Sequence, residues 1–402
     1  MSTFKKCRAC RGGDLKTILN FGDNPTSVDY KDTVTNTHKM YSLSMGTCLE
    51  CNTLQLMDHI PEINLINPPD WISYNEPEGH LDAVSDYLYE RFKDKQDIKI
   101  KGLSYKDKTL LNRLVSKKLI KSGDILFESK NTQSINIEYL QSILDHEYCK
   151  NLVKKNGLVD ILIVRHVLEH TFRPKQFIDG IRALVSPGGL IIFEIPDCSK
   201  QLHNLDYTCL WEEHTFYFVK KTFENFLLNY GLEVEKIYTY EYSIENSLVA
   251  ICRNSVNKNP IKKIDSDELY YGTSLNRYSK HFSSIKKQIQ AFVLKQKQKG
   301  TIVLFGAGHL AVTFIHIYEL KNLIDFVIDD DPNKIGKYMP GSSIEIKPSL
   351  YLNNKNIGTC LLSLSPESEK VVLDMKYEDF KMIGSVYSIF PGKLNSIPIG
   401  VN

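Results

Sequence analysis

Four cysteines near the start of the chain have the spacing of a metal site. Cys7 and Cys10 form one CxxC pair, and Cys48 and Cys51 form a second. Each pair places two thiolates on one tight turn, and two such turns supply the four sulfur ligands that structural Zn²⁺ prefers. Four protein ligands leave no position open for a substrate. We therefore expect a structural Zn²⁺ in a small N-terminal domain, with redox-active cysteines as the alternative.

Ionisable side chains follow two buried strands expected in the middle of the chain. One apolar run ends at Arg165 and His166, with Glu169 and His170 just beyond, and the next apolar run carries Glu194 near its end. Open α/β sheets bind ligands at the carboxyl ends of their strands. These side chains are therefore expected to border a binding site. For Glu194, a substrate contact and a satisfied core carboxylate are both open.

A short loop at 101–108 occupies the place of a cofactor loop but has a single glycine, Gly102. Glycines let the backbone approach a bound cofactor, so this loop is an unusual one. Glu128 follows a strand-like run at the distance where related folds place an acid that binds ribose. The predicted cofactor-binding residues are Gly102, Ser104, Asp107, Glu128, Arg165 and His166.

The segment "WISYNEPEGH" carries Tyr74, Glu76, Glu78 and His80. Side chains two residues apart lie on one side of an extended chain, so the last three would face one way. They are predicted to bind substrate hydroxyl groups or a metal ion, with an acidic surface loop as the alternative.

A second glycine turn lies in "TIVLFGAGHLAVTFI", which reads as a strand, a turn and a helix. Gly306 and Gly308 would allow a phosphate to approach the helix N-terminus, and His309 would touch a diphosphate. No third glycine follows at the usual spacing, so NAD is not predicted. A purely architectural domain is the alternative.

The hydrophobic pattern predicts an α/β protein of three domains. Residues 1–65 are turn-rich, and residues 66–255 alternate helical and strand patterns. The third predicted domain, 256–402, opens within a polar linker at 254–268 and continues as another α/β unit. We predict a small zinc-binding domain, a Rossmann-like central domain and a second Rossmann-like domain, in that order.

The composition is that of an ordinary globular protein. The 402 residues are 42% hydrophobic and 24% charged, with a formal net charge of +2. Such a balance gives no strong field for nucleic acid or a membrane surface. No apolar run reaches the roughly 20 residues that span a bilayer, and the N-terminus lacks a signal-peptide core. We predict a cytoplasmic protein without nucleic-acid or membrane partners.

Four segments occur in a recognisable order: "CRAC…FGDNP…CLECNTLQL", "VRHVLEH…LVSPGGLIIFEIP", "WEEHTFYF" and "FGAG…DDDPNKIGKYMPGSSIEI". Together they resemble the three-domain sugar C-methyltransferases, which methylate the C3 carbon of nucleotide-linked 4-keto sugars with S-adenosylmethionine (SAM). The resemblance covers nearly the whole chain. It implies a class I methyltransferase-like central domain and a C-terminal domain that closes over the substrate.

The segment "LWEEHTFYF" resembles the family's catalytic Tyr-His-Glu-His. This match implies that His214 takes the proton beside the sugar ketone and that Glu213 orients it. The segment "WISYNEPEGHLD" loosely resembles a family segment that borders the active site, and this likeness implies that Tyr74 lies beside the reacting centre. Trp211 and Glu212 depart from the family's tyrosine and first histidine, and His309 replaces a residue that is usually small. The substrate-binding residues implied are Glu76, Glu78, His80, Glu194, Gly306, Gly308 and His309.

The sequence therefore predicts a SAM-dependent C-methyltransferase that acts on a nucleotide-activated keto sugar in surface polysaccharide or glycan synthesis, as a monomer or small homo-oligomer. Two alternatives stay open because the cofactor loop is atypical. One is another nucleotide-sugar transformation without SAM, and the other is a non-catalytic binding subunit.

Overall fold

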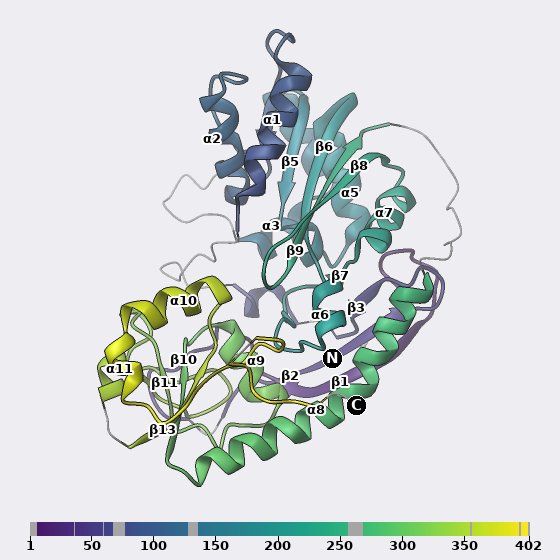
Figure 1. Ribbon diagram of the computed structural model, residues 1–402. Helices are drawn as coiled ribbons and strands as arrows, with labels where there is room; N and C mark the ends of the chain where they lie inside the picture. Colours follow the sequence, from purple (N-terminus) through teal and green to yellow (C-terminus); the bar gives the residue numbers. More distant parts are fainter. Residues whose placement is uncertain are drawn as a thin grey trace.

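The structure is a computed structural model that describes residues 6–35, 37–58, 60–66, 77–127, 136–255, 268–353, 356–393 and 395–400, with side chains of 268–271 left out. Three predicted site residues lie outside these ranges, namely Tyr74, Glu76 and Glu128. The described residues form three parts, each built on its own sheet (Figure 1).

The N-terminal part is an antiparallel sheet of four strands in the order β1-β2-β3-β7. Its strands are β1 (Leu15–Asn24), β2 (Tyr41–Cys48), β3 (Leu54–Leu56) and β7 (Phe216–Tyr217). The first three are close in sequence, and β2 ends at the first cysteine of the second CxxC pair. Strand β7 comes from the middle of the chain and pairs with β3. The N-terminal sheet is therefore completed by a segment of the predicted central domain.

The central sheet has the order β4-β5-β6-β9-β8. Its strands are β4 (Ile100–Gly102), β5 (Val159–Arg165), β6 (Val185–Asp197), β8 (Glu233–Tyr240) and β9 (Asn246–Arg253). The first three strands of the sheet are parallel, whereas β9 runs antiparallel to both β6 and β8. Strands β5 and β6 lie between layers of helices, and this position explains their nearly continuous apolar runs.

The order of the strands reverses at β4. On one side β4 pairs with β5, and on its other side Gly102 forms an isolated parallel bridge with Ile125. The strand-like run before Glu128 is thus reduced to a single bridge in the described residues. After β4 the chain first adds Ile125 on one side of this strand and then adds β5 on the opposite side. The carboxyl ends of β4 and β5 therefore form a topological switch point, where such sheets bind ligands.

Helices cover both faces of the central sheet (Figure 1). They are α1 (His80–Phe92), α2 (Lys108–Ser116), α3 (Ile137–Ile143), α4 (His146–Asn156), α5 (Pro174–Leu184) and α7 (Lys220–Asn229). Helix α6 (Ser199–Asn204) lies apart from them, and its Leu202 belongs to a core that the N-terminal and C-terminal parts share. Helices α1 and α2 pack on Ile161 and Ile163 of β5. Helices α5 and α7 pack on Leu162 and Val164, which face the other way. The alternation along β5 thus ties both helical layers to one strand.

The C-terminal part has a parallel sheet in the order β12-β11-β10-β13-β14. Its strands are β10 (Thr301–Phe305), β11 (Phe326–Ile328), β12 (Ile346–Lys347), β13 (Ile357–Leu362) and β14 (Val386–Ser388). Its helices are α8 (Glu268–Lys297), α9 (His309–Ile317), α10 (Pro366–Met375) and α11 (Tyr377–Lys381). None of the described helices has both the length and the apolar content that a membrane crossing requires.

The N-terminal and C-terminal parts share one hydrophobic core. Helix α8 lies alongside β1 (Figure 1), and the rings of Phe21 and Phe282 meet edge to face with centroids 5.0 Å apart. Ile285 and Ile289 extend the same core. The domain limits at 65/66 and 255/256 stay predictions, and residues 67–76 and 256–267 beside them are outside the described ranges.

Candidate functional site

The four predicted zinc ligands converge at one end of the N-terminal sheet. Sulfur atoms of Cys7 and Cys51 lie 3.6 Å apart, as do those of Cys10 and Cys48. Sulfurs bound to one tetrahedral Zn²⁺ at about 2.3 Å lie about 3.8 Å from one another, so the four thiolates fit this ion. A side chain at Gly13 would place its Cβ 2.4 Å from the Cys48 sulfur, so the turn requires glycine.

Backbone and side-chain amides also point at these sulfurs. The backbone N–H groups of Glu50 and Cys51 donate to Cys48 Sγ at 3.4 Å, and Gln55 Nε2 donates to Cys7 Sγ at 3.1 Å. Such donors stabilise thiolate charge, which is what a bound metal requires of its ligands. The geometry therefore supports the predicted structural zinc centre.

The loop after β4 is tied across the switch point to β5. Ser104 caps the 3₁₀ turn at Tyr105–Asp107, and its backbone N–H donates to Asp107 Oδ2 at 2.8 Å. The other carboxylate oxygen of Asp107 accepts from the backbone N–H of Arg165 at 2.9 Å. A Cβ at Gly102 would lie 2.5 Å from that of Asp107. Gly102 is thus needed for the packing of this loop, and Asp107 holds the loop in place.

Arg165 is the centre of a buried charge network at the same edge of the sheet. Its Nε donates to Glu194 Oε2 at 2.5 Å, and its Nη1 lies 3.1 Å from both Glu78 Oε1 and Thr109 Oγ1. Nη1 also donates to the carbonyl oxygen of Lys106. Burial lowers the pKa of Arg165, but Glu194 more than offsets this and raises it above its usual range. The guanidinium therefore stays charged in the interior.

Glu194 has the contacts of a satisfied core carboxylate, which is one of the two interpretations left open for it. It accepts from Arg165 and from Ser247 Oγ at 3.0 Å, and it lies 3.2 Å from His166 Nε2 and 3.0 Å from His80 Nε2. Burial raises the pKa of Glu194, but His166, His80 and Arg165 together hold it well below its usual range. A role in substrate binding stays a prediction.

Three predicted site residues are positioned by this network. His80 begins α1 and pairs through Nδ1 with the hydroxyl of Tyr242 at 2.7 Å. Glu78 accepts from Thr109 Oγ1 at 2.7 Å. His166 follows β5 with φ of 51°, a left-handed conformation that non-glycine residues rarely adopt. Strained backbone of this kind occurs disproportionately at functional sites.

One nitrogen of the Arg165 guanidinium offers a test of the predicted cofactor. Nη2 is buried and has no hydrogen-bond partner in the described part of the protein. An unsatisfied buried donor is costly, and an anionic ligand group at the switch point would satisfy it. The methionine carboxylate of SAM is such a group. The residues present therefore fit this cofactor at its amino-acid end, and Arg165 and the backbone after Gly102 would hold it there.

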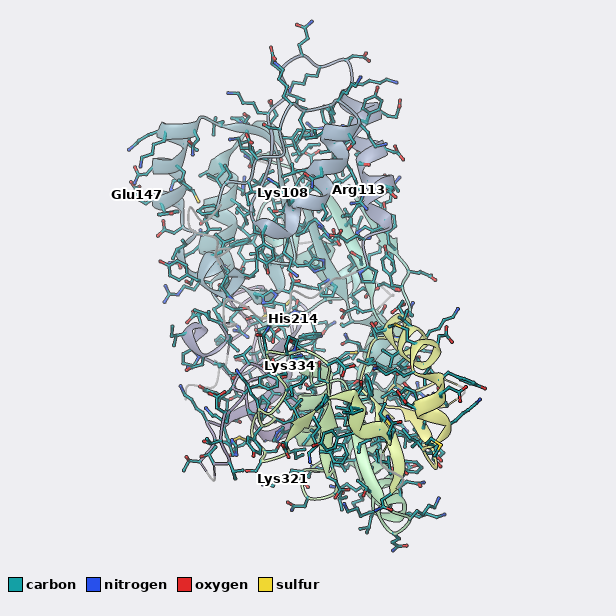
Figure 2. The ribbon with its side chains drawn as sticks, turned by 90° about the vertical axis from the view of Figure 1, so that its left-hand side faces the viewer. Lys108, Arg113, Glu147, His214, Lys321 and Lys334 are labelled. Atoms are coloured by element: carbon teal, nitrogen blue, oxygen red, sulfur yellow. The ribbon has the colours of Figure 1, made fainter. Side chains whose placement is uncertain are left out.

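Two histidines and two glutamates form a second ionisable cluster next to the switch point. His170 Nδ1 lies 2.5 Å from Glu138 Oε1, and its ring meets that of His214 at 4.7 Å and 77°. Both carboxylate oxygens of Glu169 are buried and accept no hydrogen bond within the described ranges, and Oε1 lies 3.4 Å from His166 Nδ1. Figure 2 labels His214 at the junction between the central and C-terminal parts. The cluster therefore lies where a substrate held between these parts would meet it.

The pKa values of the two histidines shift in opposite directions, and the described residues show no hydrogen bond between His214 and its predicted partner Glu213. Burial and the neighbouring His170 hold the pKa of His214 well below its usual range. Burial also lowers the pKa of His170, but Glu138 reverses this and raises it. Burial, and then repulsion by Glu212, raise the pKa of Glu213 to about 7. Among the described residues no hydrogen bond joins Glu213 to His214, so the carboxylate partner of a histidine here is Glu138.

Trp211, Glu212 and His309 meet where the three parts of the protein join. The rings of Trp211 and His309 stack with centroids 3.7 Å apart and planes 8° apart. Glu212 accepts from the backbone N–H of Ser27 at 2.5 Å and lies 3.2 Å from His309 Nδ1. His309 Nε2 faces the carbonyl oxygen of Leu210 at 2.8 Å. His309 is thus part of the interface between the three parts, and its contact with a diphosphate stays a prediction.

The glycine turn before α9 is packed from both sides. Gly306 has φ of 102°, and a Cβ there would lie 2.7 Å from Leu364 Cδ2. The backbone N–H of Ala307 donates to Asp329 Oδ2 at 2.8 Å. Gly308 immediately precedes α9. The two glycines are thus explained by the turn itself, and their phosphate contact stays a prediction.

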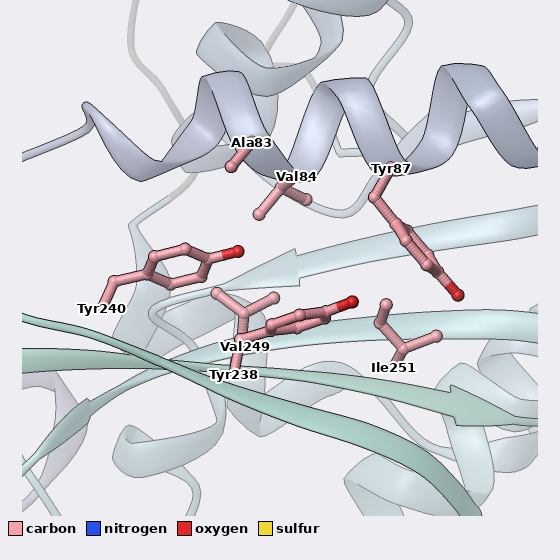
Figure 3. Close-up of a pocket in the computed structure, with 7 residues that line it drawn as sticks. All are labelled: Ala83, Val84, Tyr87, Tyr238, Tyr240, Val249 and Ile251. Atoms are coloured by element: carbon pink, nitrogen blue, oxygen red, sulfur yellow. The ribbon is translucent and has the colours of Figure 1, made fainter.

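Two small cavities lie elsewhere in the central part. One of about 100 Å³ lies between α1 and strands β8 and β9, and Figure 3 shows its tyrosine-rich lining. The other, of about 150 Å³, lies at the start of β6. Small-molecule sites usually measure about 300–1,000 Å³, so neither is assigned to a substrate. The cavity in Figure 3 is lined by Ala83, Val84, Tyr87, Tyr238, Tyr240, Val249 and Ile251.

Sequence reasoning missed the role of Glu138. It follows the helix-capping residue Asn136 at the start of a short helix, and no spacing or motif connects it with His170. The stacking of Trp211 on His309 was also missed. The departures from the family pattern at Trp211, Glu212 and His309 could have indicated this contact, because residues that touch one another tend to be substituted together.

Three family descriptions match successive parts of the chain. Residues 7–65 match "Putative zinc binding domain", residues 99–237 match "Methyltransferase domain" and residues 253–378 match "C-methyltransferase C-terminal domain". Their order and extent confirm the predicted fold class and its three kinds of domain.

One curated relative is the C-methyltransferase NovU of Streptomyces niveus, 22% identical over 221 residues. The match covers 52% of this chain and 52% of that protein, so it spans about half the length of each. Solved structures with some likeness include a SAM-dependent methyltransferase from Archaeoglobus fulgidus, at 15% identity and a TM-score of 0.28, with 43% of this chain and 95% of that chain covered. An O-methyltransferase family protein from Burkholderia thailandensis reaches 11% identity and a TM-score of 0.27 over 43% and 57%.

Proposed function

We propose that the chain is a three-domain SAM-dependent C-methyltransferase, because it matches a zinc-binding, a methyltransferase and a C-methyltransferase C-terminal domain in that order. We further propose that it methylates a nucleotide-activated keto sugar at a carbon beside the ketone. The product would serve surface polysaccharide or glycan synthesis. The substrate class is carried over from the family resemblance, and NovU is itself described as a C-methyltransferase.

The observation that carries the proposal is the unpaired guanidinium nitrogen of Arg165 at the switch point. A buried cation with a spare donor attracts a carboxylate, and Glu194 and Glu78 fix its orientation from two sides. Bound there, SAM would supply an electrophilic methyl group. Asp107 keeps the loop backbone folded against β5 beneath this position. Arg165 and this loop would thus seat the methyl donor.

Carbon methylation also requires removal of a proton from the carbon beside the ketone. That proton is weakly acidic, so a base or an electrophile near the carbonyl oxygen must assist. The histidine–carboxylate cluster lies at the same edge of the sheet and supplies candidates for both. The assignment of the proton to His214, made from the family resemblance, stays a prediction within this proposal.

Calorimetry with SAM and with S-adenosylhomocysteine tests the methyl-donor half of the proposal. Wild-type protein is expected to release or absorb heat and to melt at a higher temperature with either compound. Arg165→Met should lose most of this response, whereas Lys117→Met, at an exposed ion pair on α2, should keep it. No binding by wild-type protein at millimolar SAM would remove SAM from the proposal.

A second function is a transformation of the same substrate class without SAM. It is favoured by Ser104 and Asp107, whose hydrogen bonds close the loop on itself. Solvent deuterium exchange at the carbon beside the ketone separates the two functions. Exchange without SAM binding would favour the second, whereas exchange with SAM-dependent methylation supports the first.

A further inference from the structure

Three side chains around the switch point converge in the manner of metal ligands. One oxygen of Glu169 and one ring nitrogen each of His170 and His214 all lie within 4.8 Å of one another. Glu169 and His170 come from the turn after β5, and His214 comes from the segment before β7. No motif spacing links this set, because His214 is far from the other two in sequence. Only the fold brings the three donors together.

Glu169 is the member that most requires a cation. Its side chain is 1% exposed, and neither carboxylate oxygen has a hydrogen-bond partner among the residues that the structure describes. An ionised carboxylate in the interior is costly unless it is paired or binds a metal. The nearest ring nitrogen, Nδ1 of His166, lies 3.4 Å away, beyond a good hydrogen bond. A metal ion among the three donors would compensate this charge directly.

His170 already has the outer contact that metal-binding histidines usually have. Its Nδ1 is held by Glu138 at 2.5 Å, and this leaves Nε2 as the other ring nitrogen. Ligating imidazoles almost always donate their second ring N–H to a carboxylate, which fixes the ring and strengthens the ligand. Glu138 is 5% exposed, and its carboxylate pairs with His170 from the first turn of α3. The arrangement is therefore a carboxylate–histidine pair directed at the centre of the cluster.

We propose that Glu169, His170 and His214 bind a divalent first-row transition metal ion, distinct from the zinc held by the four cysteines. Two imidazole nitrogens and one carboxylate oxygen suit Zn²⁺, Fe²⁺, Mn²⁺ or Co²⁺. Ligand atoms of one tetrahedral ion at about 2.0–2.1 Å lie about 3.4 Å apart. The three donor atoms now lie within 4.8 Å of one another, and small side-chain rotations would bring them to that spacing.

Three protein ligands leave at least one position open to another ligand. The His170 side chain is 12% exposed, so the centre is not sealed from the surroundings. If the proposed function holds, a ketone oxygen at the open position would be polarised, and the neighbouring C–H would become more acidic. His214 would then act as a ligand in place of a proton acceptor, since one lone pair cannot bind both an ion and a proton.

Metal content of the full chain tests the proposal. After dialysis against Zn²⁺ and removal of free ion, wild-type protein is expected to hold about two Zn²⁺ per chain, one in each centre. Addition of Co²⁺ to protein with zinc in the cysteine site should produce visible d–d bands without a thiolate charge-transfer band. Uptake of a single Zn²⁺ by wild-type protein, with no cobalt spectrum, would overturn the proposal.

Variants identify the ligands. Glu169→Gln and His170→Ala should each hold one Zn²⁺ per chain, and that retained ion reports an intact cysteine domain. Glu138→Gln removes only the outer contact and should weaken the second ion about 10–100-fold. His146→Gln, at an exposed histidine on α4, is the matched control and should hold two. Equal metal content in all four variants would reject the assignment. SAM binding is measured separately, so a failure of either proposal is recognised by itself.

Discussion

The indole of Trp211 stacks on the imidazole of His309 with centroids 3.7 Å apart and planes 8° apart. These residues stand at two positions where the sequence departs from the family that it resembles, and the third departure, Glu212, contacts His309 as well. The three unusual residues, Trp211, Glu212 and His309, are thus in contact and form a single cluster. It joins the segment before β7 to the first residue of α9 and, through Ser27, to the N-terminal part.

A double-mutant cycle should reveal this contact as an energetic coupling. Aromatic pairs contribute about 0.5–1.5 kcal/mol beyond the area they bury. Trp211→Ala, His309→Ala and the double variant should therefore deviate from additivity by about 1 kcal/mol in urea unfolding. Tyr377→Ala, at an exposed ring on α11, combined with His309→Ala provides the control and should be additive within about 0.5 kcal/mol. Full additivity of the first pair would show that the stack adds nothing.

Local patterns in the sequence predicted the elements that carry the site. The four cysteines identified their own cluster, because CxxC spacing places two sulfurs on one turn without help from the rest of the fold. The apolar runs before Arg165 and around Glu194 predicted two buried parallel strands, and both exist as β5 and β6. Since the ends of neighbouring strands meet at one edge, the association of Arg165 with Glu194 followed from the topology.

Contacts between distant segments had no local signal. Glu138 reaches His170 from a separate helix, and nothing in the spacing of either residue records this. Strand β7 has two residues, too few for an alternating pattern, yet it completes the N-terminal sheet. The predicted pairing of His214 with Glu213 relied on adjacency in sequence. Neighbouring side chains often diverge in direction, and here no hydrogen bond between them is present among the described residues.

Loss of one cysteine ligand should release one Zn²⁺ and destabilise the N-terminal sheet. In Cys48→Ser, three sulfurs remain on turns that depend on the ion for their shape, because metal binding and folding are coupled in such domains. Metal analysis should find one Zn²⁺ fewer per chain, and thermal unfolding should begin at a lower temperature. Cys360→Ala, a buried cysteine of β13 outside the cluster, should keep its zinc. Equal zinc in Cys48→Ser and wild type would contradict the assignment.

His214→Asn should slow deuterium exchange beside the ketone by at least about 100-fold. A positioned base contributes about 10²–10⁴ in rate, and loss of a metal ligand would remove the polarising ion instead. The two causes differ in metal content, which stays unchanged only if His214 serves as a base. SAM binding should stay near wild type, because Arg165 is untouched. Exchange at the wild-type rate would mean that His214 has no part in the reaction.

His316 should make stability depend on pH below neutrality. Burial lowers its pKa to about 4, and Lys321 and His38 contribute in the same direction, while the carbonyl oxygen of Pro340 opposes them. The unfolded chain, with a histidine pKa near 6.5, then binds more protons than the folded one between about pH 4 and 6.5. Stability is therefore full above about pH 6.5 and is lost as the pH falls towards 4.

The size of this loss can be measured against a variant. A shift of two to three pKa units corresponds to about 3 kcal/mol as an upper limit. Urea unfolding at pH 7.5 and pH 5 should give a smaller difference for His316→Gln, which keeps a donor for Pro340, than for wild type. His146→Gln, at an exposed position, should behave like wild type. The same pH dependence in all three proteins would exclude His316 as its source.

Removal of the Arg165 charge should be among the most destabilising single changes in the central part. Arg165→Met leaves Glu194 buried without its main cation, and breaking a buried ion pair in this way costs about 3–5 kcal/mol. Glu194→Gln in the same chain removes the stranded charge and should recover part of that loss. Lys117→Met breaks an ion pair with Asp86 that is largely exposed, so it should cost less than about 1 kcal/mol. Urea unfolding of the three variants, with SAM calorimetry on those that remain folded, separates the role of Arg165 in stability from its role in binding SAM. If the double variant regains stability and still fails to bind SAM, the guanidinium is needed for the ligand itself, because the fold no longer depends on it.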